Sequence, residues 1–364
     1  MQQNINKITL LFPISLILYE LPLYFSNTLF LPVLPEITKN FQVSNATGQL
    51  SIAYWFLGAS LFQVFLDPLA DRCGRRNILL GGGILFVFAT LLCSLTHHII
   101  WFLIGRFSQG CVVSSILITG YATVHEVMKR EQAVKIISWM SGIAVLAPAL
   151  GPLLGSLLLQ QMNWRELFIA LSAFTVLSLY LLYIFMPEGK VSAERLVLKK
   201  FFFGYRTIFT NFQFWIYTLF FCFLFASLIA WNTLSPFYLM DYLKLNLIQF
   251  GFVQLFVYGS FIVGIYLERL LIYPIEEILK GGFFLTTIYF ILSLFTLMHS
   301  PSHLFWVVGS VLLFYMSTGL IFNALYRKAI EIPKVPKGTI IVVFSITMNL
   351  FGCLGSLAAR SLDF

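Results

Sequence analysis

The chain has 364 residues, of which 59% are hydrophobic and only 10% are charged, and its mean hydropathy is +0.88. Soluble domains carry about 25% charged residues, so this composition excludes an ordinary water-soluble globular protein. The formal charge of +8 does not indicate nucleic-acid binding, because the basic residues lie in short segments between long apolar runs.

At about 20 apolar residues per crossing, these runs predict an all-α membrane protein with eleven transmembrane helices. The predicted spans cover residues 8–34, 46–69, 78–96, 99–123, 133–159, 166–186, 209–236, 246–267, 281–298, 303–325 and 339–359. A polar stretch at residues 188–206 divides six spans from five, which indicates two helical bundles (residues 1–187 and 207–364) joined by a cytoplasmic linker. The odd number leaves the second bundle one helix short, so we interpret that bundle as truncated.

The distribution of basic residues predicts the orientation. Of the 23 Lys and Arg, Arg106 lies within a span and four lie on one side of the membrane, at Lys39, Arg165, Lys244 and Arg360, which leaves 18 on the other side. Lys and Arg are concentrated in cytoplasmic loops, so we expect the N-terminus and the residue 188–206 linker to be cytoplasmic.

The first span contains an acid, Glu20, near the middle of its apolar run. A carboxylate at that depth costs about 3 kcal/mol, so it normally faces a protein interior or a water-filled cavity. Tyr24 and Asn27 follow at i+4 and i+7, which places all three side chains on one face of a helix. This polar stripe predicts the wall of a transport pathway, and hence a carrier.

The loop after the second span reads Asp67-Pro-Leu-Ala-Asp71-Arg72-Cys-Gly74-Arg-Arg. It resembles the G-x-L-(A/S)-D-R-x-G-R-(R/K) loop of the major facilitator superfamily, with Asp67 in place of the first glycine. Glycine permits a sharp reversal of the chain, and an acid with several arginines can bridge helix ends. We expect Asp71 and Arg72 to latch the two bundles together in the outward-open state; an ordinary positively charged turn is the alternative. The complete predicted gating motif is Asp71, Arg72, Gly74, Arg75 and Arg76.

The fourth span carries Arg106, Gln109 and Gly110, which resemble the R-x-x-Q-G motif that the superfamily links to proton coupling. A guanidinium cannot discharge itself by deprotonation, so Arg106 needs a partner on another helix or backbone carbonyl groups. Its positive charge would favour the ionised form of Glu20 when the two approach. A structural arginine that holds helix ends is the alternative.

The fifth span has a face of small residues and two prolines, which permit close helix contact and weaken the helix backbone. It resembles the superfamily's antiporter signature, G-x8-G-x3-G-P-x2-G-G, although several of its glycines are other small residues here. A general packing face is the alternative. The residues that carry the antiporter interpretation are Pro148, Gly151, Pro152 and Gly155.

Residues 11–13, 18–20, 24–27 and 147–153 resemble the MdfA-type multidrug/proton antiporters of that superfamily. By this resemblance, Glu20 binds a proton or a cationic drug. The cavity around it would be lined by Tyr24, Asn27, Met140 and Ala144, to which we add Arg106, Gln109, Tyr121 and Gln254. Thr28 stands where the subgroup has a second acid, so a proton and a cation would compete for Glu20 alone.

The resemblance implies an efflux antiporter of the bacterial inner membrane that exports lipophilic drugs, cationic or neutral, in exchange for protons. It implies a monomer in the lipid bilayer that uses the proton gradient, with no cofactor, no metal, no bound nucleic acid and no enzymatic activity. Two alternatives remain open. One is a proton-driven importer of a small metabolite, and the other is a truncated relic that transports nothing.

Overall fold

The computed structural model describes residues 2–187, 205–333 and 335–360, and every regular element in these ranges is helical. For residues 2–10 and for Val64, Asp67, Pro68, Asp71 and Leu117, only the backbone is described. Nine of the described helical segments are long and apolar enough to cross a membrane, and Leu11–Phe25 is a shorter apolar helix. The prediction of an all-α membrane protein is confirmed.

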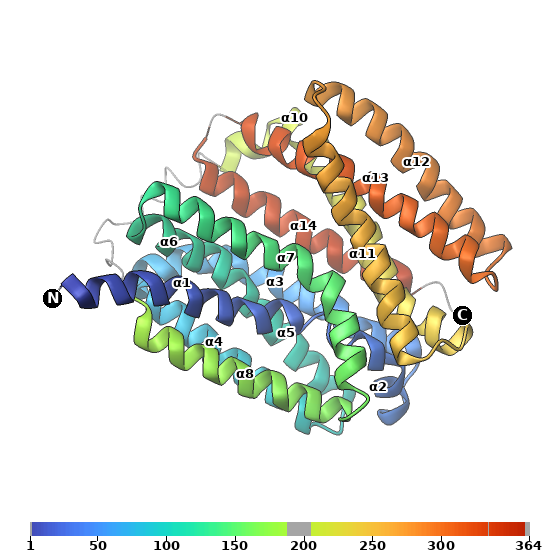
Figure 1. The fold of residues 1–364 in the computed structure, drawn as a ribbon, viewed down its shortest axis with the longest axis horizontal. Helices are drawn as coiled ribbons and strands as arrows, with labels where there is room; N and C mark the ends of the chain where they lie inside the picture. Colours follow the sequence, from blue (N-terminus) through green and yellow to red (C-terminus); the bar gives the residue numbers. More distant parts are fainter. Residues whose placement is uncertain (1, 188–204, 334, 361–364) are drawn as a thin grey trace.

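The helices before residue 188 form the first half of the fold and those after residue 204 form the second half (Figure 1). The first half contains α1 (Gln2–Phe25), η1 (Leu31–Val33), α2 (Leu34–Asn40), α3 (Asn45–Cys73), α4 (Arg75–Leu95), α5 (Ile99–Ser115), η2 (Ile116–Gly120), α6 (Tyr121–Val127), α7 (Arg130–Leu158) and α8 (Trp164–Phe185). The second half contains α10 (Phe212–Pro236), η3 (Phe237–Tyr242), α11 (Leu247–Leu270), α12 (Ile275–His299), α13 (Leu304–Glu331) and α14 (Lys337–Ala359).

The two halves repeat one packing pattern. In the first half α3 and α4 pack against α5, and α1 packs against α7; in the second half α11 and α12 pack against α13, and α10 packs against α14. The halves meet along two helix pairs, α3 with α14 and α7 with α11. A repeated bundle is the architecture expected of a duplicated carrier. The predicted linker falls largely on residues 188–204, which lie outside the described residues, so the boundaries at 187 and 207 stay a prediction.

The first predicted span, residues 8–34, differs from the structure. Helix α1 ends at Phe25, and the chain then turns before it enters η1 and α2. The carbonyl oxygen of Ser26 accepts a hydrogen bond from Arg106 (2.8 Å), and the hydroxyl of Ser26 accepts one from the Trp55 indole (3.3 Å). Asn27 therefore lies in a turn, and the prediction of an unbroken helix through it was wrong.

One end of the fold, here named the Lys39 end, holds α2, η3 and two of the polar contacts that join the halves. Lys39 Nζ lies 2.8 Å from Asp241 Oδ1, and the Ser356 hydroxyl donates to the carbonyl oxygen of Gln49 (3.3 Å). The opposite end, named the Gly74 end, holds the turn between α3 and α4, where Gly74 has φ = 81°. Only glycine adopts that conformation without strain, so the predicted chain reversal is present.

Candidate functional site

A cavity of about 290 Å³ lies between the two halves of the fold. Helices α1, α3, α5 and α7 and the turn after α1 line it from the first half, and α10, α11, α13 and α14 line it from the second. Its aromatic lining consists of Trp55, Phe56, Phe225, Tyr258, Phe261 and Phe322. Its polar lining consists of Tyr24, Asn27, Thr28, Ser114, Asn232 and Asn349. All residues that line it are uncharged, which suits a lipophilic ligand.

Glu20 is fully buried within α1, one helical turn before Tyr24 on the cavity wall. The hydroxyl of Tyr121 donates a hydrogen bond to Glu20 Oε1 at 3.2 Å. Among the described residues, Glu20 Oε2 is buried and has no hydrogen-bond partner. A buried carboxyl group that has one oxygen without a hydrogen-bond partner can exchange a proton or bind a polar ligand, because the protein supplies few hydrogen bonds to it.

Arg106 is also fully buried, and oxygen atoms of the first half surround its guanidinium. Nη1 donates to the carbonyl oxygen of Ser26 (2.8 Å) and to Gln109 Oε1 (2.5 Å), and Nη2 donates to Asn27 Oδ1 (2.9 Å). Its charged carbon lies 4.3 Å from the centre of the Phe30 ring, within the range of a cation–π contact. The guanidinium thus binds backbone and amide oxygens, while Glu20 pairs with Tyr121.

This arrangement makes Arg106 a positioning group for the cavity. Its hydrogen bond occupies the side-chain oxygen of Asn27, so the side-chain nitrogen of Asn27 can donate to other partners in the cavity that Asn27 lines. Gln109 extends this hydrogen-bond network to α4, because its Nε2 donates to Thr90 Oγ1 at 2.8 Å. Arg106 and Gln109 therefore support the site from behind its wall.

Helix α7 supplies one side of the cavity, through Ala144 and Pro148 among others. It packs so closely on the turn after α1 that a Cβ atom added at Gly151 or Gly155 would lie 2.0 Å from an atom of Thr28 or Leu29. The Thr28 hydroxyl donates to the carbonyl oxygen of Ala147 at 3.2 Å. The small residues predicted for antiport thus serve this contact, and Pro152 is buried beside them.

Of the predicted proton- and substrate-binding residues, only three are among those that line the cavity: Tyr24, Asn27 and Ala144. Glu20, Arg106, Gln109 and Tyr121 make the hydrogen bonds described above, and Met140 and Gln254 have other surroundings. Met140 is fully buried in the hydrophobic core. Gln254 is fully buried in α11 and donates a hydrogen bond to the hydroxyl of Ser235 in α10. Both belong to the packing around the site in this conformation, and neither is among the residues that line the cavity.

Arg75 and Arg76 of the predicted gating motif contact other helices of the first half. Arg75 Nη1 lies 2.7 Å from Glu126 Oε2 at the end of α6, and Arg76 Nη2 donates to the carbonyl oxygen of Tyr183 in α8 (2.7 Å). Arg72 is exposed, and the side chain of Asp71 lies outside those described. The structure thus ties α4 to α6 and α8, and the latch between halves stays a prediction for the outward-open state.

Asn232 and Asn349, two buried amides of the second half that line the cavity, were not predicted from the sequence. Both lie inside apolar spans, as Glu20 does. The signal that selected Glu20, a polar group at membrane depth, applies to them as well. What the sequence does not reveal is which face of each helix points to the cavity.

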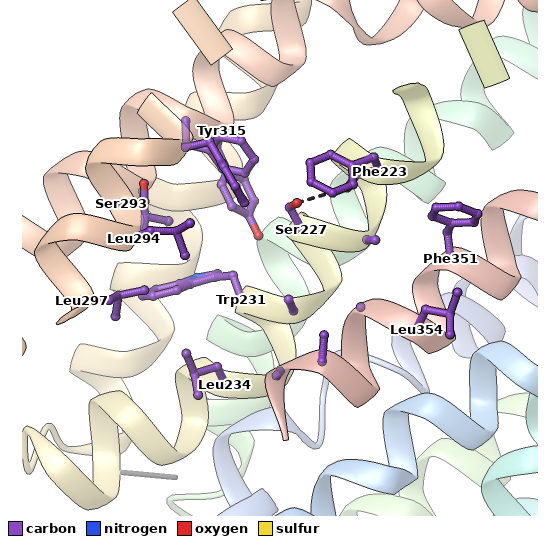
Figure 2. Close-up of a pocket in the computed structure, with 18 residues that line it drawn as sticks. Phe223, Ser227, Trp231, Leu234, Ser293, Leu294, Leu297, Tyr315, Phe351 and Leu354 are labelled. Carbon is purple, nitrogen blue, oxygen red and sulfur yellow. Dashed lines mark hydrogen bonds between the residues drawn. The ribbon is translucent and has the colours of Figure 1, made fainter. Parts of the chain in front are cut away.

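A second hollow, here named the groove, lies on the other side of α10 and is larger than the central cavity, about 390 Å³ (Figure 2). It is lined by α10, α12, α13 and α14, almost entirely by apolar side chains such as Phe223, Trp231 and Leu354. All four helices belong to the second half. We place the candidate site in the central cavity, because alternating access rocks one bundle against the other around a site that both of them line.

Comparison with known proteins decides the family. The model of the Major Facilitator Superfamily matches residues 16–356. The chain belongs to this superfamily. The D-xylose–proton symporter has the same fold, with a TM-score of 0.78 at 14% identity over 97% of this chain and 90% of that one.

Two curated relatives cover nearly the whole chain. The chloramphenicol resistance protein CraA of Acinetobacter baumannii is 33% identical over 94% of this chain and 84% of its own length. The multidrug transporter MdfA of Escherichia coli is 27% identical over 97% of this chain and 87% of its own length. The resemblance to MdfA-type transporters stated from the motifs is confirmed.

Proposed function

We propose that this protein exports lipophilic drugs, cationic or neutral, across the bacterial inner membrane in exchange for protons. The single observation that carries the proposal is the buried carboxyl group of Glu20, with one vacant oxygen, one turn from a cavity lined by both halves. The names of the relatives, a chloramphenicol resistance protein and a multidrug transporter, support drugs as the cargo. The proton gradient supplies the energy, no cofactor takes part, and the monomer is the working unit.

Proton exchange falls to Glu20, because it is the one acid in the first 35 residues. Protonation removes the charge and leaves a neutral carboxylic acid that still hydrogen-bonds to Tyr121. Loss of the proton restores a carboxylate next to the cavity wall, where a cationic drug can neutralise it. Proton and cation therefore exclude each other at one group, which couples their movements.

Alternating access follows from the contacts between the halves. In this conformation Lys39 and Asp241 close the Lys39 end. With the N-terminus in the cytoplasm, that end faces the periplasm, so the conformation is closed to the outside. We propose that opening breaks this ion pair and closes the Gly74 end, where Asp71 and Arg72 then latch the halves.

The test is efflux of chloramphenicol and ethidium from cells, with and without a protonophore, for the wild type and for Glu20→Gln. Glu36→Gln is the matched control, because Glu36 is an exposed acid on α2. We expect the protonophore and Glu20→Gln to abolish uphill efflux and Glu36→Gln to leave it unchanged. Efflux that survives both treatments would refute proton exchange at Glu20. Uptake of substrate into right-side-out vesicles would instead identify an importer, and neither activity would indicate a protein that transports nothing.

A further inference from the structure

Two amides of the second half differ from the hydroxyl groups of Thr28 and Ser114, which line the same cavity. Asn232 in α10 is 2% exposed and Asn349 in α14 is 7% exposed, and α10 packs directly against α14. The hydroxyls of Thr28 and Ser114 are satisfied, since they donate to the carbonyl oxygens of Ala147 and Ala59. Among the described residues, neither asparagine amide has a protein hydrogen-bond partner, and the Oδ1 atom of Asn232 is fully buried.

Buried amides nearly always have hydrogen-bond partners, because an amide withdrawn from water loses its bonds to water without replacement. An asparagine side chain offers two donors and one acceptor. The two amides line a cavity whose other walls are largely apolar, both aromatic and aliphatic, so a bound molecule is the partner that this geometry provides.

The two faces of α10 line different spaces. Asn232 and Phe225 lie on the face toward the central cavity. Phe223, Ser227 and Trp231 lie on the face toward the groove in Figure 2, where the Ser227 hydroxyl donates to the carbonyl oxygen of Phe223 (3.0 Å). The Ser227 hydroxyl on the groove face is thus satisfied within its own helix, whereas the Trp231 indole nitrogen on that face and Asn232 Oδ1 on the cavity face have no hydrogen-bond partner among the described residues.

We propose that Asn232 and Asn349 form a hydrogen-bonding subsite for uncharged aromatic drugs that carry hydroxyl, amide or nitro groups. The aromatic walls bind the ring, and the two amides bind the polar groups in a cavity lined by uncharged residues. A cation without hydrogen-bonding groups gains nothing from these amides and depends on Glu20. The proposal rests on the proposed function, because it assigns part of the same cavity to one substrate class.

The test is equilibrium binding to the purified protein of two probes, chloramphenicol and tetraphenylphosphonium. Chloramphenicol is neutral and carries hydroxyl, amide and nitro groups, whereas tetraphenylphosphonium is an apolar cation with none of them. We expect Asn232→Leu and Asn349→Leu each to weaken chloramphenicol binding by about 2- to 12-fold, the value of one neutral hydrogen bond. Tetraphenylphosphonium binding should change by less than about 2-fold. Ser227→Ala, on the groove face of α10, is the matched control and should change neither.

Each outcome decides a separate point. Unchanged chloramphenicol binding in both leucine variants, or equal weakening of both probes, overturns the subsite. Retained tetraphenylphosphonium binding also shows that a variant is folded. If a leucine variant fails to fold, Asn232→Ser and Asn349→Ser keep a hydrogen-bonding group, and selective partial loss of chloramphenicol binding supports the subsite while equal loss refutes it. A wild type that binds neither probe refutes the proposed function itself.

Discussion

Replacement of Gly155 by alanine tests how closely α7 packs on the segment after α1. A Cβ atom at this position would lie 2.0 Å from the carbonyl oxygen of Leu29, 2.9 Å from its carbonyl carbon and 3.2 Å from its Cα. An ordinary carbon–oxygen contact is about 3.3 Å, so the two segments must separate by about 1 Å. The obstacle is backbone, which cannot rotate away as a side chain can. Overpacking of this kind costs about 1–3 kcal/mol.

Gly142→Ala is the matched control, because it lies on the same helix and its added Cβ would meet nothing within 4 Å. Both variants gain the helix propensity of alanine over glycine, worth about 1 kcal/mol. The difference between them therefore isolates the clash, and we expect Gly155→Ala to be about 1–3 kcal/mol less stable than Gly142→Ala. Thermal unfolding of the purified proteins in detergent, followed by tryptophan fluorescence, measures this difference. A melting temperature for Gly155→Ala equal to or above that of Gly142→Ala would contradict the packing described for α7.

Two further changes test the polar contacts. Arg106→Lys keeps the positive charge, but one ammonium group cannot reproduce the planar guanidinium that binds Ser26, Asn27 and Gln109. We therefore expect efflux of both neutral and cationic drugs to fall at least about tenfold. Efflux at the wild-type rate would show that the positive charge alone suffices. Lys39→Asp should impair transport by setting two acids against each other at the Lys39 end, and the double variant with Asp241→Lys should restore it. Because the Lys39 side chain is 69% exposed and that of Asp241 is still 25% exposed, the effect of the pair on stability should stay below about 1 kcal/mol, which thermal unfolding checks.

The transmembrane helices were predictable because each depends on a local property, the length of an apolar run. Residues 166–186 and 339–359 were predicted as spans, and the structure has helices at Trp164–Phe185 and Lys337–Ala359. The break after Phe25 was not predictable in this way, because the following residues are still largely apolar. What fixes that turn is tertiary: a guanidinium from α5 and an indole from α3 bind Ser26.

The candidate site shows the same difference between residues that local sequence identifies and partners that only the tertiary structure identifies. Glu20 and Arg106 stand out in the sequence because a charge within an apolar run has few explanations. Their partners could be predicted only as classes, since Tyr121 is about a hundred residues from Glu20 and Ser26 is 80 residues from Arg106. Asn232 and Asn349 were missed because an amide is common enough to pass for a packing residue until the cavity is located.

Thr28 sets the charge balance of the proposed exchange. Its hydroxyl binds the carbonyl oxygen of Ala147, so this position holds the turn after α1 against α7 and contributes no titratable group. If Glu20 alone exchanges, one proton enters for each drug molecule that leaves. Exchange against a monovalent cation then moves no net charge, and the pH gradient alone drives it. Exchange against a neutral drug moves one charge inward, so the membrane potential adds about 2.3 kcal/mol per 100 mV. A single buried carboxyl group therefore favours neutral drugs in energised cells, the same class that the unpaired amides of the cavity suit.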